Sequence, residues 1–122
     1  PRHTHLNSNG LRGRQCEQKR AAWCNVERPF GDAIFGLAVF DHPSNPGHPS
    51  AWRVDEQGLI NPSVTALSGW SIPAGETRAF RYRILVYRGV ASAERLDREF
   101  KVFASGATGP EKSSPAPKEI KP

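Results

Sequence analysis

Apolar and polar residues alternate most regularly between residues 77 and 88. In an extended chain, four apolar or aromatic residues of this segment face one side: Phe80, Tyr82, Ile84 and Val86. The opposite side is mixed: Arg81, Arg83, Leu85 and Tyr87. A period of two predicts a strand, and one apolar face beside one mixed face predicts that the strand lies in a half-exposed sheet.

Two shorter apolar runs, residues 20–26 and 33–40, come earlier in the chain. Both are rich in aromatic and β-branched residues, and the segment between them, 28–32, contains Pro and Gly. This pattern predicts two strands joined by a turn or a short loop. The second run is apolar almost throughout, which is typical of a strand covered on both faces. Gly36 in its middle predicts a close backbone approach or a bulge.

A single helix is predicted near the C-terminus. Ser92 is a residue type that caps helix N-termini, and Gly106 is placed to end the helix. Between them, large apolar residues recur at helical spacing: Leu96, Phe100 and Phe103. Residues 105–122 are rich in Pro, Ser and Lys and have almost no large apolar side chain, so they are predicted to form a disordered tail.

These segments predict an all-β fold over residues 1–104, an antiparallel β-sandwich with one short C-terminal helix. The chain has 122 residues, of which 37% are hydrophobic, and this is enough for one domain. No apolar run approaches the roughly 20 residues of a spanning helix, so no membrane association is expected. The chain opens without Met, which suggests missing upstream sequence. A periplasmic or secreted location would need an export signal upstream of Pro1.

The formal charge of +5, from 17 basic and 12 acidic residues, raises the question of a polyanionic partner. The arginines are scattered singly, and no block of five or six basic residues occurs. A solvated surface is therefore preferred over a polyanion-binding face, and nucleic-acid binding is not expected. Cys16 and Cys24 are too few for a disulfide framework. Two unpaired, partly buried thiols are preferred over a bridge across a hairpin.

Reactive side chains are most concentrated between residues 41 and 52, in the run DHPSNPGHPSAW. Its three prolines exclude a helix or a ladder-forming strand and predict a rigid loop. His42, with Asp41 or His48, could transfer a proton near neutral pH. Trp52 could stack on a sugar ring. In the alternative interpretation, Asp41 makes turn hydrogen bonds, the histidines bind backbone carbonyls and Trp52 packs in the core.

Neither a cofactor nor a metal is expected. A metal site needs three or four converging ligands, and the obvious candidates are few: His3, His5, Asp41, His42 and His48. The chain also has no phosphate-binding glycine loop, no nucleophile elbow and no paired-cysteine zinc spacing.

Several runs of the sequence resemble one protein family. They are GLAVFDHPSNPGHPSAWRVDEQGLINP at 36–62, LNSNGLRG at 6–13, KRAAWCNV at 19–26 and PAGETRAFRYRILVYRG at 73–89. These runs resemble the C-terminal part of the DUF6807 domain, which often carries the label methane oxygenase PmoA-like. That label does not suit this chain, since the copper membrane enzyme needs several spanning helices.

The family is similar in expected fold to the large β-sandwiches of galactose mutarotase, so the resemblance implies a sugar-related role. Five positions of this sequence match the family's loop motif, and the resemblance implies a functional role for them: His42, Asn45, His48, Trp52 and Asn61. The first hypothesis is a domain that binds or processes a carbohydrate. In this hypothesis His42 or His48 is catalytic, and the ligand-binding residues are Asp41, Asn45, Trp52 and Asn61.

Two other classes of function stay open. One is a non-catalytic structural or interaction module, or a truncated inactive fragment. The other, less favoured, is polyanion binding through the arginines. Because a partial sandwich would expose an apolar face, self-association or instability is also expected, and the sequence does not give the oligomeric state.

Overall fold

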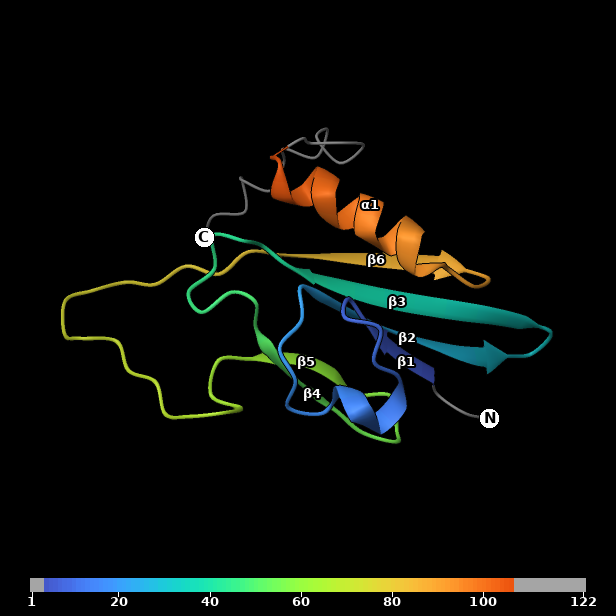
Figure 1. Cartoon of the computed structure of the whole chain (residues 1–122), viewed down its shortest axis with the longest axis horizontal. Coiled ribbons are helices and arrows are strands. Elements are labelled where there is room, and N and C mark those ends of the chain that lie inside the picture. Colours follow the sequence, from blue (N-terminus) through green and yellow to red (C-terminus); the bar gives the residue numbers. More distant parts are fainter. Residues whose placement is uncertain (1–3, 107–122) are drawn as a thin grey trace, which may run out of the picture.

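The computed structural model describes residues 4–106 (Figure 1). The elements, in chain order, are β1 (Thr4–Asn7), a short 3-10 helix η1 (Gly13–Cys16), β2 (Trp23–Phe30), β3 (Ala33–Asp41), β4 (Ala51–Val54), β5 (Ile60–Ser63), β6 (Tyr82–Arg88) and α1 (Ala93–Ala104). The predicted disordered tail lies outside the described residues except for Ser105 and Gly106, which end α1.

Four strands form one antiparallel sheet in the order β1-β2-β3-β6, and β4 and β5 pair as a second, smaller sheet. Helix α1 covers one face of the larger sheet, and the β4–β5 pair with η1 lies on the other side (Figure 1). This arrangement confirms the predicted all-β, sandwich-like fold with one C-terminal helix. No helix among residues 4–106 is long and apolar enough to cross a membrane.

The hairpin of β2 and β3 is confirmed, but its strands are longer than the apolar runs that predicted them. Pairing continues to Phe30 opposite Ala33, so the turn is reduced to Gly31 and Asp32. Gly31 has a φ of +65°, a conformation that glycine adopts without a steric cost. Residues 28–30 were predicted as a connection because of Pro29, but the ladder extends through them.

Gly36 makes the close approach that the sequence predicted. It lies opposite Tyr87 of β6, and a Cβ atom placed on it would lie 2.1 Å from the Tyr87 Cζ atom. The ring therefore lies across the glycine. Its hydroxyl donates to Glu27 Oε2 at 2.7 Å and accepts a hydrogen bond from Asn25. Burial, together with the Glu27 carboxylate, raises the pKa of Tyr87 well above its ordinary value.

Helix α1 follows its predicted limits. The Ser92 hydroxyl accepts a hydrogen bond from Arg95 N at 3.1 Å, and Gly106 has a φ of +86° just past the C-cap. Leu96 and Phe103 are buried against the sheet, and Trp23 Nε1 donates to the helical Asp97 carboxylate at 2.8 Å.

Strand β6 is shorter than predicted, and its apolar face is the exposed one. It begins at Tyr82 rather than at residue 77, and the mixed face is the one that packs under α1, through Leu85 and Tyr87. The apolar face is turned to solvent, where Ile84 is 61% exposed and Val86 is 67% exposed. The alternation is confirmed, but its apolar side does not face the core.

Cys16 and Cys24 are both free thiols, as preferred from the sequence, and both are buried in the layer between the two sheets. The hydrogen bond between the two thiols lowers the pKa of Cys16 and, with burial, raises that of Cys24.

Candidate functional site

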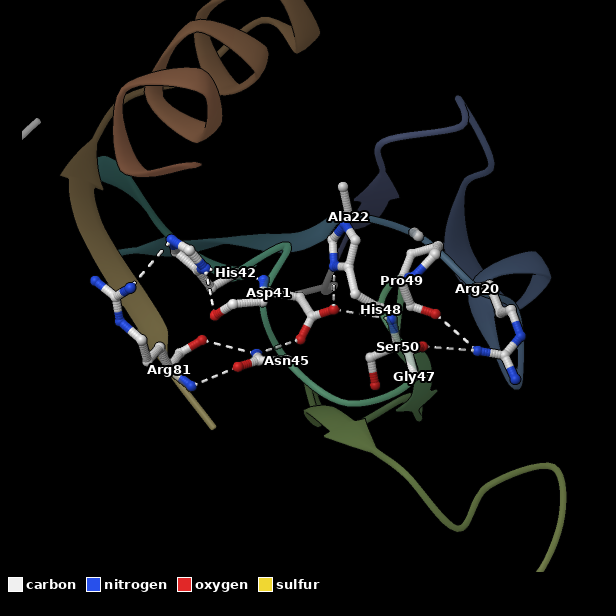
Figure 2. Close-up of polar contacts among 12 residues, drawn as sticks. Arg20, Ala22, Asp41, His42, Asn45, Gly47, His48, Pro49, Ser50 and Arg81 are labelled. Atoms are coloured by element: carbon white, nitrogen blue, oxygen red, sulfur yellow. Dashed lines mark hydrogen bonds and ion pairs between the residues drawn. The ribbon is translucent and has the colours of Figure 1, made fainter. Parts of the chain in front are cut away.

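The proline-containing loop of residues 42–50 connects β3 to β4 and brings most of the predicted site residues together (Figure 2). Two successive backbone hydrogen bonds fold it, from Asn45 N to His42 O at 2.9 Å and from His48 N to Asn45 O at 3.1 Å. Gly47 has a φ of +76°, and the peptide bond between His48 and Pro49 is cis. The loop is therefore a series of tight turns, as its composition predicted.

The Asp41 carboxylate organises this loop from its buried position at the end of β3. Only 1% of Asp41 is exposed. Its Oδ1 atom accepts from Asn45 Nδ2 at 2.7 Å, while Oδ2 accepts from His48 Nδ1 at 2.6 Å and from Ser50 N at 2.9 Å. Three donors from three positions of the loop thus converge on one carboxylate, which ties both ends of the loop together.

Asn45 ties the loop to the segment that leads into β6. Its Oδ1 atom accepts from Arg81 N at 2.6 Å, and its Nδ2 atom donates to Arg81 O at 2.8 Å as well as to Asp41. The side-chain amide therefore pairs with the Arg81 backbone as a neighbouring strand would. The Arg81 backbone, one residue before β6, is thus held by the loop. Both amide hydrogens of Asn45 are used inside the protein.

His48 forms a hydrogen-bonded pair with Asp41. The carboxylate holds Nδ1 at 2.6 Å, and the ring stacks parallel to Phe100 of α1 with 6.1 Å between ring centroids. The His48 side chain is 19% exposed. A carboxylate on Nδ1 fixes the tautomer and orientation of an imidazole, so the only ring nitrogen that could exchange a proton with a ligand is Nε2.

His42 lies between α1 and the Arg81 side chain. Its Nδ1 atom is 2.8 Å from Ser44 Oγ and accepts from Ser44 N at 3.0 Å, and its Nε2 atom lies 3.3 Å from Arg81 Nη1. The ring packs edge-on against Phe103 at 4.9 Å. Burial, followed by the positive charges of Arg81 and His48, lowers the pKa of His42 below its ordinary 6.5.

This lowered pKa predicts a pH-dependent stability. Because the unfolded chain binds a proton at His42 more readily than the folded chain, the stability contribution of His42 is present above pH 6.5 and is lost as the pH falls below it. We expect the free energy of unfolding, measured by urea titration, to fall between pH 7 and pH 5. His42→Gln should flatten this part of the profile. An identical profile in the variant would contradict the assignment.

Two of the residues predicted to bind a ligand lie outside the loop. Trp52 is fully buried in the layer between the sheets, and its Nε1 atom donates to Ala21 O at 2.8 Å. Its indole is therefore part of the core. Asn61 lies on β5 opposite Arg53 with its side chain exposed, outside the hydrogen-bond network of the loop. The structure thus brings together Asp41, His42, Asn45 and His48.

A hollow of about 100 Å³ beside the loop brings together residues that the sequence analysis did not single out. Arg20, Gly47, Ser50, Ser63, Ser68 and Trp70 contribute to its lining. Arg20 Nη1 donates to Gly47 O at 3.1 Å and to Pro49 O at 2.8 Å, so the loop holds the guanidinium at the rim (Figure 2). Trp70 is 38% exposed. An indole within a run of Ser and Gly was the signal that could have found this site.

Within residues 4–106 no group of three or more His, Cys, Asp or Glu side chains could hold a metal ion. Of the histidines considered for such a site, His5 is buried on β1 with Nε2 2.9 Å from Leu59 O, and His3 lies outside the described residues.

One protein family matches the chain in comparison with known proteins. Its description is "Family of unknown function (DUF6807)", and its model matches residues 2–101. The match includes Asp41, His42, Asn45 and His48 and every strand of the described residues. No curated protein and no solved structure matches the chain.

Proposed function

The chain belongs to the DUF6807 family, and from this premise we propose that it is a carbohydrate-binding domain whose ligand lies in the hollow beside the proline-containing loop. The observation that carries the proposal is the partly exposed indole of Trp70 in a hollow that Arg20 and three serines also line. Sugars have apolar C–H faces and polar edges, so an aromatic ring beside fixed hydrogen-bond donors matches both.

Arg20 supplies the polar side of this proposed site. Both hydrogens of its Nη1 atom are used by the carbonyls of Gly47 and Pro49. The guanidinium has five N–H donors in a fixed plane, so three remain on Nε and Nη2 for the hydroxyls of a ligand. Because the two carbonyls already orient the group, little side-chain entropy is lost on binding.

The buried hydrogen bonds of Asp41 hold the part of the loop that borders this proposed site. Asp41 holds Ser50 N, and Ser50 lines the hollow, while the turns that Asp41 closes present the two carbonyls to Arg20. His42 and His48 are not among the residues that line the hollow. In this proposal the two histidines position the loop, and the domain binds sugar without transforming it.

The catalytic role predicted for the histidines is a second candidate, supported by one observation. The hydrogen bond of 2.6 Å from His48 Nδ1 to Asp41 is the arrangement that orients a general base. A ligand processed by His48 would have to reach Nε2 beside Phe100 rather than the hollow. The placement of the chain in the C-terminal part of a larger sandwich stays a prediction from the resemblance.

The binding proposal can be tested through tryptophan fluorescence. Trp23 and Trp52 are buried, so among the three tryptophans Trp70 is the one that a ligand or acrylamide can reach. We expect a panel of mono- and oligosaccharides to include one that protects the fluorescence from acrylamide quenching. Trp70→Ala should weaken its binding about tenfold in calorimetry, corresponding to roughly 1.4 kcal/mol of lost stacking.

Phe30→Ala provides the matched control, since Phe30 is an exposed aromatic residue at the tip of the β2–β3 hairpin. Binding unchanged by Trp70→Ala, or no binding by any sugar of the panel, would contradict the proposal. Turnover of a bound sugar that His48→Gln abolishes would favour the catalytic candidate instead.

A further inference from the structure

Strand β6 lies at an edge of the larger sheet, and two of its features indicate that it pairs with another strand. Beyond β3, no strand among the described residues pairs with β6. On the face opposite α1, the layer formed by β4 and β5 does not cover β6, and Tyr82, Ile84 and Val86 remain 38%, 61% and 67% exposed. An open strand edge with alternate apolar side chains is a template for pairing with another strand.

Room for such a strand exists along this edge. A groove of about 710 Å³ borders the first half of β6 and is lined by residues 80–85 together with Glu99 and Phe103 of α1. Helix α1 therefore borders the groove on one side. A partner strand could thus lie against β6 beside the helix.

The hydrogen-bond pattern of β6 shows which backbone groups point outward. Gly89 N donates to Ile34 O at 2.7 Å, and His42 N donates to Arg81 O at 3.2 Å, so the odd-numbered residues of this strand bond to β3. Antiparallel pairing alternates between bonded and non-bonded positions. The N–H and C=O groups of Tyr82, Ile84, Val86 and Arg88 therefore point to the open edge.

We propose that the partner is a second copy of this chain, paired antiparallel through β6 about a two-fold axis at Leu85 to give a continuous eight-stranded sheet. In this register Ile84 of one copy lies opposite Val86 of the other, and Tyr82 lies opposite Arg88. All four are residues whose backbone groups point outward, so about eight interchain hydrogen bonds form. This register uses all seven residues of the strand.

The charges of β6 support this register. Arg88 lies opposite the half-exposed ring of Tyr82, a favourable cation–π arrangement across the interface, and Arg83 lies opposite Tyr87 instead of opposite another arginine. A register shifted so that Arg83 meets Arg83 would place two positive charges together. Because the axis is perpendicular to the sheet, both copies keep α1 on the same face, and the exposed apolar residues lie together on the other.

Sedimentation and light scattering of the full 122-residue chain test the association. We expect a species of about twice the 13.5 kDa chain mass at micromolar concentration. Ile84→Lys should give a monomer of unchanged circular dichroism, because it places a charge against Val86 without touching the core. Leu59→Lys, at an exposed apolar residue in the β4–β5 turn, should leave the dimer intact. A wild-type monomer throughout would overturn the proposal.

Cysteine cross-linking tests the register. The double variant Ile84→Cys with Val86→Cys should form an interchain disulfide on mild oxidation, since these positions face each other across the axis. The single variant Ile84→Cys should not form this disulfide, because position 84 of one copy is displaced by two residues from position 84 of the other. Cross-linking of the single variant alone would overturn the axis at Leu85. The native thiols are buried and should not contribute.

Discussion

Asp41→Asn is expected to lower the free energy of unfolding by about 3 to 4 kcal/mol, although the substitution hardly changes the size of the side chain. The carboxylate accepts hydrogen bonds from Asn45, His48 and Ser50, and it is 1% exposed. An amide has only one acceptor oxygen, so either orientation of it turns an N–H donor toward one of these donors. At least one buried donor is then left without an acceptor.

Urea denaturation followed by circular dichroism measures this loss. Asp32→Asn is the matched control, because Asp32 is an exposed residue of the β2–β3 turn and Asn suits such a turn equally well. We expect the control to change the free energy of unfolding by less than about 0.5 kcal/mol. If Asp41→Asn were equally mild, the carboxylate would not organise the loop, and the support that it gives to Arg20 would have to come from elsewhere.

The parts of the fold that the sequence predicted well are those determined by local chemistry. Ser92 and Gly106 mark the ends of α1 because capping depends on a few neighbouring residues. The β2–β3 hairpin follows from two apolar runs on either side of a glycine turn. Gly36 was informative because a residue without a Cβ in the middle of an apolar strand usually has a neighbour that needs the space.

The orientation of β6 could not be predicted in the same way. The pattern separates two faces, but which face is covered depends on where α1 and the β4–β5 pair come to lie. Tyr87 faces inward because Gly36 leaves room for its ring, and Arg83 can lie on the same face because its guanidinium packs over Phe103 at 4.9 Å. Both contacts join residues far apart in the sequence, so no local pattern contains them.

In the candidate site, too, the features set by neighbouring residues were predicted and those set by distant contacts were not. The sequence grouped Asp41, His42, Asn45 and His48, and these side chains lie close together because a short rigid loop keeps its own residues near one another. It missed Arg20 and Trp70, which reach the hollow from distant segments. Arg20 is 27 residues from Gly47, its hydrogen-bond acceptor. Their meeting depends on the packing of β4 and β5 against the larger sheet, which a sequence pattern does not describe.

Gly36→Ala is expected to destabilise the protein by about 3 kcal/mol, the upper part of the usual range for overpacking a core. The added methyl group would overlap the Tyr87 ring, which lies directly opposite on β6. The ring cannot easily move away, because Glu27 and Asn25 hold its hydroxyl and the Arg95 guanidinium lies 5.4 Å from its centroid. Displacing it would also break a buried hydrogen-bond network.

Thermal unfolding of Gly36→Ala, compared with Gly69→Ala, measures the cost of this overlap. Gly69 has open space where a Cβ would lie and no positive φ, so its substitution should be nearly neutral. A double-mutant cycle with Tyr87→Leu then assigns the cause, because a smaller side chain makes room for the methyl group. We expect Gly36→Ala to cost much less in the Tyr87→Leu background than in the native chain. An equal cost in both backgrounds would mean that the glycine is required for its backbone conformation, not for the ring that lies across it.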